Sequence, residues 1–243
     1  MNVVAIIPAR MGSTRFPGKP LARISGKPMI QHVYENASAC TLIERVVVAA
    51  DDNAVLQEVQ AFGGEVFMTS CDHQTGTDRV AEVARKLDAE IIVNIQGDEP
   101  LLPPDAMEKA IRPLIEDAGL VMATLKTALR PEDDPRDPNI VKVATDSRGH
   151  ALYFSRSPIP FKRNDTPAAQ LYRHIGLYVF RRSFLFAFAA LPQTPLELTE
   201  SLEQLRALEH GHAIAVAETL YYPLGVDVPS DIDRVEAILR TQG

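Results

Sequence analysis

Positive charge is concentrated near the start of the chain. Five cationic residues lie within the first 27 residues without any Asp or Glu among them: Arg10, Arg15, Lys19, Arg23 and Lys27. The excess is local, because the whole chain of 243 residues carries a formal charge of -7. Clustered cations and free backbone N–H groups attract anions, and Gly12 and Gly18 let the backbone approach a bound group closely. Residues 10–20 therefore predict a phosphate-binding loop; the alternative is an ordinary solvated basic loop.

The glycine spacing distinguishes this loop from the P-loop of nucleotide hydrolases. The P-loop motif has a shorter spacing between its glycines, and a Ser or Thr after its Lys binds magnesium. Here five residues separate Gly12 from Gly18, and Pro20 follows Lys19. Any magnesium ion must therefore be bound by carboxylates elsewhere in the chain.

Two aspartates are candidates for binding magnesium. Asp98 follows an apolar run within residues 96–100 (Gln-Gly-Asp-Glu-Pro), and Asp227 precedes the last helical pattern. Magnesium usually takes only one or two protein carboxylates beside substrate phosphates. Both residues also have structural alternatives. Asp98 or Glu99 could cap the following helix, and an Asp before a helix is often a turn former.

A third polar group lies in residues 173–178. His174, Gly176 and Tyr178 alternate with apolar residues, so they share one face of a predicted strand. This face has room for a polar ligand, although a solvated face is the alternative. No Ser-His-Asp or Cys-His pair has a recognisable local setting. Cations, carboxylates and polar groups without an activated nucleophile favour direct phosphoryl or nucleotidyl transfer, in which positioning and charge stabilisation supply most of the catalysis.

The elements that must position these residues alternate between strands and helices. Continuous apolar runs predict buried strands at 3–7, 45–50, 65–68, 91–95 and 120–125. Helices are expected near Pro28, after Asp51 and Asp52, behind a Thr77 cap and near Pro104. This alternation is typical of an α/β fold with a doubly wound, mostly parallel sheet. Ligands of such sheets bind beyond the carboxyl ends of the strands, so we expect the basic loop and Asp98 to face one crevice.

The pattern changes after about residue 130. Segments 140–144 and 151–155 flank a turn and predict an antiparallel hairpin. The elements expected after it are a strand at 173–180, one helix carrying Leu198, Leu202 and Leu205, a strand at 213–217 and a helix capped by Ser230. We find no repeat and no linker. We therefore predict one nucleotidyltransferase domain over 1–243, with 131–182 as an antiparallel excursion that covers the site or forms a dimer surface.

Composition narrows the class of protein. Hydrophobic content of 46% and charged content of 23% are ordinary for a soluble globular protein. Cys40 and Cys71 have no metal-ligand spacing and fit a reducing cytoplasm. The run 3–7 lacks a preceding basic region, so it is not a signal peptide, and 184–191 is too short to cross a bilayer. The acidic balance gives no reason to expect nucleic-acid binding. We predict a cytoplasmic protein without a membrane or nucleic-acid partner.

Motifs along the chain resemble the family of 3-deoxy-manno-octulosonate (Kdo) cytidylyltransferases, also called CMP-Kdo synthetases. They lie, in the family's order, at 7–10, 13–21, 26–30, 76–79, 93–100, 151–156, 173–178, 202–206 and 226–227. The resemblance runs nearly from end to end. The related sialic acid enzymes share the basic-loop theme, but not the Ser-Thr-Arg-Phe-Pro-Gly-Lys-Pro form found at 13–20.

The resemblance implies a reaction and a set of residue roles. The anomeric hydroxyl of Kdo attacks the α-phosphorus of CTP, pyrophosphate leaves, and CMP-Kdo forms for lipopolysaccharide synthesis. Mg²⁺ is the implied cofactor, and a homodimer is the implied assembly. The implied catalytic residues are Arg10, Arg15, Lys19 and Asp98. CTP binding is implied for Ala9, Arg10, Ser13, Arg15, Lys19, Thr69, Asp72 and Gly76, sugar binding for Gln96, Arg156, His174, Tyr178, Glu203 and Gln204, and metal binding for Asp98 and Asp227. Arg156 is the implied partner of the sugar carboxylate, because a guanidinium can engage it bidentately.

Two alternatives to this reading stay open. The first is the same reaction on 8-amino-Kdo, which has an amine in place of the terminal hydroxyl; residues 96–100 resemble the Kdo form more closely. The second is a non-catalytic sensor of CTP or a sugar nucleotide. A sensor does not need two substrate pockets, so the presence of both the metal carboxylates and the sugar-side residues argues against it.

Overall fold

The computed structural model describes residues 1–12, 16–164 and 170–242, which adopt an α/β fold with a mostly parallel sheet, as predicted. The chain forms two compact units, Met1–Glu108 with Pro223–Gly243, and Lys109–Tyr222. The boundary falls within helix α4 (Pro104–Glu116). The excursion predicted at 131–182 lies inside the second unit, and the single domain over 1–243 stays a prediction. In the described ranges, every helix is too short or too polar to span a membrane.

The first unit is built on four parallel strands in the order β6-β1-β4-β5. These are β1 (Val3–Ala9), β4 (Arg45–Ala50), β5 (Val66–Met68) and β6 (Ile91–Asn94). Three of them, β1, β4 and β6, are almost entirely buried, as expected for strands covered on both faces. Ala9 pairs with Ala50, and Ala50 pairs with Met68. The loops that follow β1, β4 and β5 therefore start side by side.

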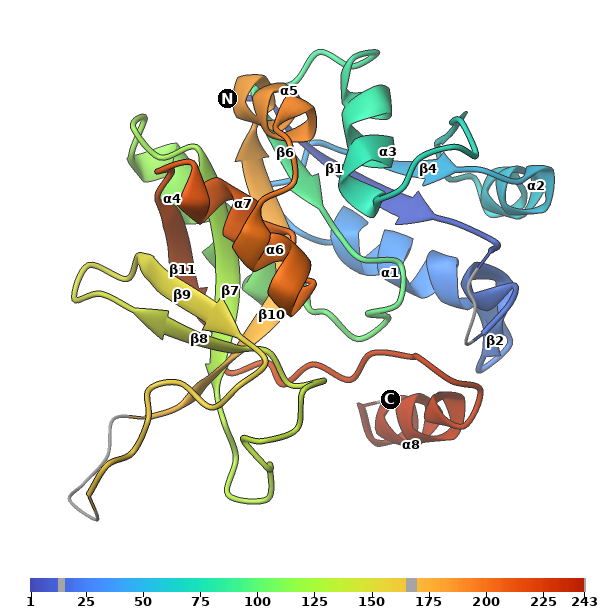
Figure 1. Cartoon of the computed structure of the whole chain (residues 1–243). Helices are drawn as coiled ribbons and strands as arrows, with labels where there is room; N and C mark the ends of the chain where they lie inside the picture. Colours follow the sequence, from blue (N-terminus) through green and yellow to red (C-terminus); the bar gives the residue numbers. More distant parts are fainter. Residues whose placement is uncertain (13–15, 165–169, 243) are drawn as a thin grey trace. The chain divides into compact units, whose positions relative to one another are not determined.

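Helices cover both faces of this sheet. Figure 1 shows α1 (Met29–Ser38) on one face and α3 (Gly76–Ala84) on the other. Helix α2 (Asn53–Ala61) packs against β4 and β5, and its N-cap Asp52 accepts a hydrogen bond from the Ala54 amide at 2.7 Å. Three short elements follow the basic loop: η1 (Lys19–Leu21), β2 (Arg23–Ile24) and β3 (Lys27–Pro28). The last helix, α8 (Asp231–Gln242), packs against β2 through the buried side chains of Ile24 and Val235.

The start of α3 differs from the sequence prediction. Thr75, not Thr77, is the N-cap: its Oγ1 accepts from the Asp78 amide at 3.1 Å, and Asp78 Oδ2 accepts from the Thr75 amide at 3.3 Å. This reciprocal arrangement is a capping box. Thr77 is buried in the first turn, where its Oγ1 accepts from Asn94 Nδ2 at 3.3 Å. The prediction was wrong because the Thr-x-x-Asp spacing selects the earlier threonine.

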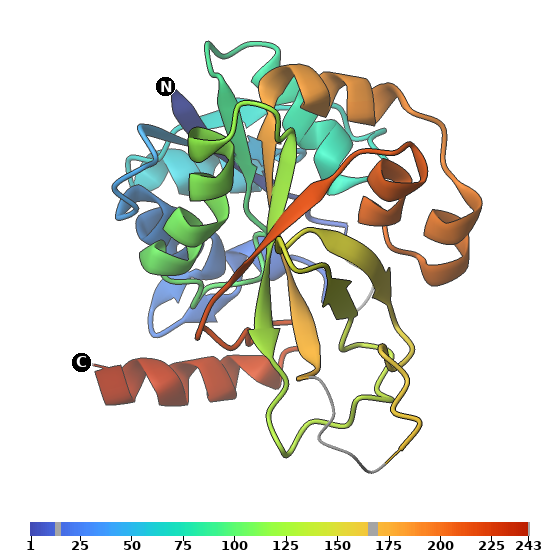
Figure 2. The same ribbon diagram turned by 90° about the vertical axis from the view of Figure 1, so that its left-hand side faces the viewer.

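The second unit holds three strands in the order β11-β7-β10, with a hairpin beside β10. Strands β7 (Met122–Ala128) and β10 (Tyr172–Arg181) pair antiparallel, and β11 (Ile214–Glu218) runs parallel to β7. The predicted hairpin is confirmed as β8 (Lys142–Thr145) and β9 (Ala151–Ser155), and Figure 2 shows it from the side. Helix α5 (Arg182–Ala190) was not predicted, because its continuous apolar run has no helical period.

The single helix predicted around Leu198 and Leu205 is two helices. They are α6 (Pro195–Glu200) and α7 (Gln204–Glu209), separated at Ser201, which has a left-handed backbone with φ 51°. A buried ion pair connects them, because Arg206 Nε on α7 donates to Glu197 Oε2 on α6 at 2.8 Å. The turn between them positions Glu203 and Gln204 at the start of α7.

His174 is buried within β10. Its Nε2 lies 2.9 Å from Thr124 Oγ1, and its ring packs edge-on against Phe154 with centroids 4.9 Å apart. Thr124 Oγ1 donates its proton to a backbone carbonyl, that of Leu177 at 2.7 Å or Ile175 at 3.1 Å. The threonine must therefore accept from the imidazole, which assigns the proton to Nε2. Burial, and then the charge of Arg173, lower the pKa of His174 to about 3.

We predict that Thr75→Ala lowers the free energy of unfolding by about 1 kcal/mol, because α3 loses its N-cap acceptor. Urea denaturation followed by far-UV circular dichroism measures this loss. The matched control is Thr199→Ala, an exposed threonine within α6, which should stay within about 0.5 kcal/mol of the parent chain. Equal losses in the two variants would contradict the capping role.

His174 should make stability depend on pH. In the unfolded chain a histidine takes up a proton below about pH 6.5, whereas in the folded chain His174 stays neutral down to about pH 3. The unfolding free energy should therefore fall as pH decreases through this window, by up to about 1.4 kcal/mol per pH unit from this one group. Denaturation at several pH values should show a shallower slope for His174→Gln than for the parent chain. Identical slopes for the variant and the parent chain would argue against a neutral His174.

Candidate active site

The basic loop starts at the carboxyl end of β1. Ala9 is the buried last residue of the strand, and Arg10 follows it with an exposed side chain. The base of the loop is closed by a hydrogen bond from the Gly18 amide to the Met11 carbonyl at 3.2 Å. Gly18 has φ 73°, a left-handed conformation that favours glycine. Ser13 and Arg15, which were also predicted to bind CTP, lie outside the described residues.

Lys19 brings the two predicted metal-binding aspartates together. Its side chain is 12% exposed, and Nζ lies 2.7 Å from Asp98 Oδ2 and 3.4 Å from Asp227 Oδ1. The three residues come from η1, from the turn after β6 and from the segment before α8, all within the first unit. Sequence positions that are far apart thus form one charged cluster.

The backbone around this cluster explains how Asp98 reaches it. A Cβ atom on Gly97 would lie 3.1 Å from the Pro8 carbonyl oxygen, so glycine lets the turn after β6 pass close to β1. The Asp98 carbonyl accepts from the Val226 amide at 2.9 Å, which holds the two aspartate segments side by side. Helix α4 starts only at Pro104, so Asp98 does not cap it.

Asp227 is not the turn former before α8. Asp231 forms this turn instead: its Oδ2 accepts from the Asp227 amide at 2.9 Å and from the Val228 amide at 3.0 Å. The Asp227 side chain contacts Lys19 and is 51% exposed. The turn before α8 is therefore held by Asp231, and the Asp227 carboxylate contacts Lys19.

The donor set fits a magnesium ion that is shared with a substrate. Asp98 and Asp227 supply hard carboxylate oxygens, which Mg²⁺ prefers. Within 1–12, 16–164 and 170–242, no group of three or more His, Cys, Asp or Glu residues could hold a metal ion by itself. Two carboxylates suffice only where substrate phosphates complete the coordination, and the adjacent basic loop is a place for such phosphates.

The other predicted CTP residues lie on the loop between β5 and α3. Thr69 is buried, and both its amide and its Oγ1 donate to the Ala50 carbonyl at 2.9 Å. Asp72 is exposed, and its carboxylate accepts from Ser70 Oγ at 3.1 Å. Gly76 begins α3 at the end of this loop. The loop therefore continues directly from the sheet edge where the basic loop starts.

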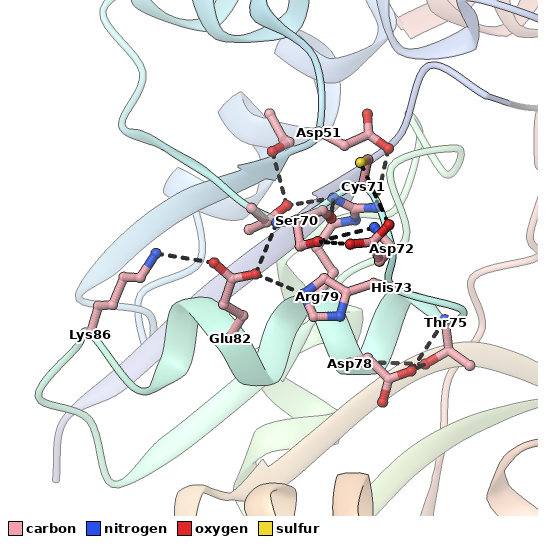
Figure 3. A network of polar contacts seen from close by, with 12 residues as sticks. Asp51, Ser70, Cys71, Asp72, His73, Thr75, Asp78, Arg79, Glu82 and Lys86 are labelled. Carbon is pink, nitrogen blue, oxygen red and sulfur yellow. Dashed lines mark hydrogen bonds and ion pairs between the residues drawn. The ribbon is translucent and has the colours of Figure 1, made fainter.

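An ionised carboxylate on α3 holds this loop in place (Figure 3). Glu82 Oε2 accepts from the Ser70 amide at 3.0 Å and lies 2.7 Å from His73 Nε2. Burial raises the pKa of Glu82, but hydrogen bonds with His73, Ser70 and Lys86 together lower it to about 2. The carboxylate is therefore charged at neutral pH and keeps its acceptor oxygens for the loop.

Five of the predicted sugar residues lie in the second unit: Arg156, His174, Tyr178, Glu203 and Gln204. Gln96 lies in the first unit, where its Nε2 donates to Asn94 Oδ1 at 3.4 Å. Tyr178 Oη donates to Gln204 Oε1 at 3.0 Å. Burial, and then the charge of Glu203, raise the pKa of Tyr178, so its hydroxyl is neutral. Residues from β10 and α7 thus meet in one polar contact.

Gln204 carries the clearest structural sign of a polar ligand. The residue is 2% exposed, and its Nε2 has no hydrogen-bond partner in the described ranges. A buried N–H without an acceptor costs free energy. A hydroxyl or carboxylate oxygen of a bound sugar would satisfy it.

Arg156 is fixed by backbone carbonyls. Its Nε, Nη1 and Nη2 donate to the carbonyls of Glu200 at 2.7 Å, Pro138 at 2.7 Å and Ser201 at 3.2 Å. A guanidinium has more N–H groups than these three bonds use, so donors remain for a ligand carboxylate. Glu200 also accepts from Ser155 Oγ at 2.6 Å and from the Arg156 amide at 2.9 Å.

Glu200 and Asp51 contact candidate site residues but were not predicted to do so. Glu200 is the last residue of α6, and its contacts are 44 and 45 residues away in sequence, so no local pattern pointed to it. Asp51 was expected only as a helix cap. A signal was present, because two aspartates follow β4 and Asp52 alone caps α2. The Asp51 carboxylate instead accepts from the Met11 amide at 3.1 Å, at the start of the basic loop.

Comparison with known proteins is consistent with this geometry. The sequence profile of the cytidylyltransferase family matches residues 4–214. A 3-deoxy-manno-octulosonate cytidylyltransferase of Syntrophotalea carbinolica is 57% identical over 248 residues, covering 99% of each chain. One of Geobacter sulfurreducens is 56% identical over 245 residues, covering 97% of this chain and 98% of the relative. A solved structure of CMP:2-keto-3-deoxy-manno-octonic acid synthetase complexed with CTP has a TM-score of 0.96 and 44% identity over the full length of both chains.

The two relatives and the solved structure match the chain over 97% or more of its length, and the family profile covers residues 4–214. The chain is therefore a nucleotidyltransferase, and it belongs to the 3-deoxy-manno-octulosonate cytidylyltransferase family.

Proposed function

We propose that the chain transfers CMP from CTP to Kdo and releases pyrophosphate, and that it supplies CMP-Kdo for lipopolysaccharide synthesis. The observation that carries this proposal is the contact of Lys19 with both Asp98 and Asp227 next to the basic loop. A chain with this cluster and full-length similarity to Kdo cytidylyltransferases has the groups that nucleotidyl transfer needs.

Positioning and charge stabilisation account for the reaction. Arg10, Ser13, Arg15 and Lys19 hold the triphosphate, and Ala9, Thr69, Asp72 and Gly76 border the nucleoside. Negative charge develops on the phosphoryl oxygens and the leaving pyrophosphate, so fixed cations nearby lower the barrier. Asp98 and Asp227 would hold Mg²⁺, which when bound neutralises phosphate charge.

The residues proposed to bind the sugar form hydrogen bonds with it and do not transfer protons. His174 is neutral because its pKa is about 3, and Tyr178 is neutral because its pKa is raised. Both side chains can therefore form hydrogen bonds with sugar hydroxyls, but neither is suited to remove a proton at neutral pH. Arg156 pairs with the sugar carboxylate, and Gln96, Glu203 and Gln204 bind hydroxyl groups.

We further propose that the protein works in the cytoplasm as a homodimer. Two observations are compatible with a reducing compartment: Cys40 is buried, and both Cys40 and Cys71 are free thiols. The homodimer rests on the family resemblance, with the excursion at 131–182 contributing to the interface. Size-exclusion chromatography with light scattering tests the assembly, and a monomeric mass would overturn it.

A pyrophosphate-release assay tests the reaction. The assay combines CTP or UTP with Kdo or 8-amino-Kdo, with and without Mg²⁺. We expect release with CTP and Kdo that depends on the metal. Faster turnover with 8-amino-Kdo would support the alternative substrate, and CTP binding without release in any combination would support a sensor.

Asp98→Asn should lower kcat by about a hundredfold or more, because a metal-binding carboxylate loses its charge where transition-state stabilisation acts. Pyrophosphate release over a range of Mg²⁺ concentrations measures the effect. Asp88→Asn, a change at an exposed aspartate of the same unit, is the control and should leave kcat unchanged. Near-normal turnover of Asp98→Asn would remove this residue from the metal site.

Gln204→Met should raise KM for Kdo by about tenfold while KM for CTP stays the same. Methionine keeps the side-chain volume but removes the buried amide nitrogen and also the oxygen that accepts from Tyr178. One lost hydrogen bond to the sugar is worth about 1.4 kcal/mol, which corresponds to a tenfold change. Steady-state kinetics with each substrate varied in turn separates the two constants. Gln57→Met, at an exposed position of α2, is the matched control. A parallel rise of both constants would show that Gln204 does not act on the sugar alone.

A further inference from the structure

A buried ion pair joins the loops at the carboxyl edge of the first sheet. Asp51 follows β4, and its two carboxylate oxygens face different partners. Oδ1 accepts from the Met11 amide at 3.1 Å, and Oδ2 accepts from Arg79 Nη2 at 3.1 Å. The side chains of Asp51 and Arg79 are 14% and 4% exposed. The carboxylate thus contacts the start of the basic loop on one side and a guanidinium on the other.

Arg79 extends this connection to the third loop. It lies on α3, and its Nη1 donates to Thr69 Oγ1 and to the Ser70 carbonyl, the latter at 3.1 Å. Figure 3 shows the guanidinium between Asp51 and the segment of Ser70. A planar fork of donors can engage a carboxylate and a loop at once, which a point charge cannot do. One ion pair therefore fixes the loops that follow β1, β4 and β5.

The Asp51–Arg79 pair fixes the positions of the loops more than it adds to the free energy of unfolding. Burying two charges costs desolvation free energy, and replacing such a pair with apolar residues is often neutral for stability. Its hydrogen bonds do, however, fix the distance between Met11 and Thr69. The first residue lies at the base of the loop proposed to hold the triphosphate, and the second borders the nucleoside.

We propose that the Asp51–Arg79 pair is a positioning device for CTP, which sets the spacing between the triphosphate loop and the nucleoside loop. The proposal rests on the proposed function of this site. Asp51 and Arg79 act through Met11, Thr69 and Ser70, so they are positioning residues and not catalytic ones. Breaking the pair should therefore affect CTP far more than the sugar.

Two conservative variants test the Asp51 carboxylate and the Arg79 guanidinium separately. In Asp51→Asn the amide oxygen can still accept from the Met11 amide, but the new NH₂ group faces the Arg79 donors. In Arg79→Lys the positive charge stays, but one ammonium cannot reach both Asp51 and the 69–70 segment in the same geometry. Each variant breaks the link while keeping a side chain of similar size.

Steady-state kinetics in the presence of Mg²⁺ tests the proposal. We expect KM for CTP to rise about tenfold or more in each variant, as lost hydrogen bonds to charged groups predict, while KM for Kdo changes little. KM for CTP of the double variant should not exceed that of the single variant with the larger effect, because both changes break the same link. Arg45→Lys is the matched control: Arg45 pairs with Glu65 on the exposed side of the same unit, and KM for CTP should not move.

Three outcomes would overturn the proposal. The first is an unchanged KM for CTP in both variants. The second is equal rises of KM for CTP and for Kdo, which indicate a general loss of structure. The third is a double variant whose effect equals the sum of the single effects, because two independent sites add. Failure of the proposed function gives a different result, since the parent chain itself would then release no pyrophosphate from CTP and Kdo.

Discussion

Parallel pairing of β1 with β4 and β6 is the constraint from which the site follows. These strands are buried on both faces, so their backbone groups must pair with each other, and the apolar side chains leave little freedom of register. The resulting register aligns the carboxyl ends of the strands. Three loops with different chemistry, those that follow β1, β4 and β5, then begin at one edge, where the Asp51–Arg79 pair connects them.

Charge is distributed so that the acidic chain can still hold an anion. Lys19 does not stand alone but contacts the carboxylates of both Asp98 and Asp227. The pattern repeats at Asp51 with Arg79, and at Glu197 with Arg206 in the second unit. In each case a cation and a carboxylate from different elements fix the geometry of a loop or turn that carries a predicted site residue.

Much of this arrangement was predictable from the sequence, because it depends on local rules. Continuous apolar runs located the strands, and a parallel sheet places its loops at one edge. The failures have physical causes as well. Thr75 and Thr77 are both suitable caps, and only the reciprocal Asp78 decides between them. The contact of Asp51 with Met11 spans 40 residues, so local patterns could not reveal it. The orphaned amide of Gln204 depends on packing and is likewise invisible in sequence.

In the segment before α8, one aspartate holds the backbone turn and another contacts Lys19, so the two positions should respond differently to substitution. The Asp231 carboxylate holds the backbone turn, whereas the Asp227 carboxylate contacts Lys19. A substitution at 231 that removes the carboxylate therefore disturbs the backbone of this turn, whereas a substitution at 227 changes the contact with Lys19. The two aspartates of one short segment should thus respond differently to the same substitution.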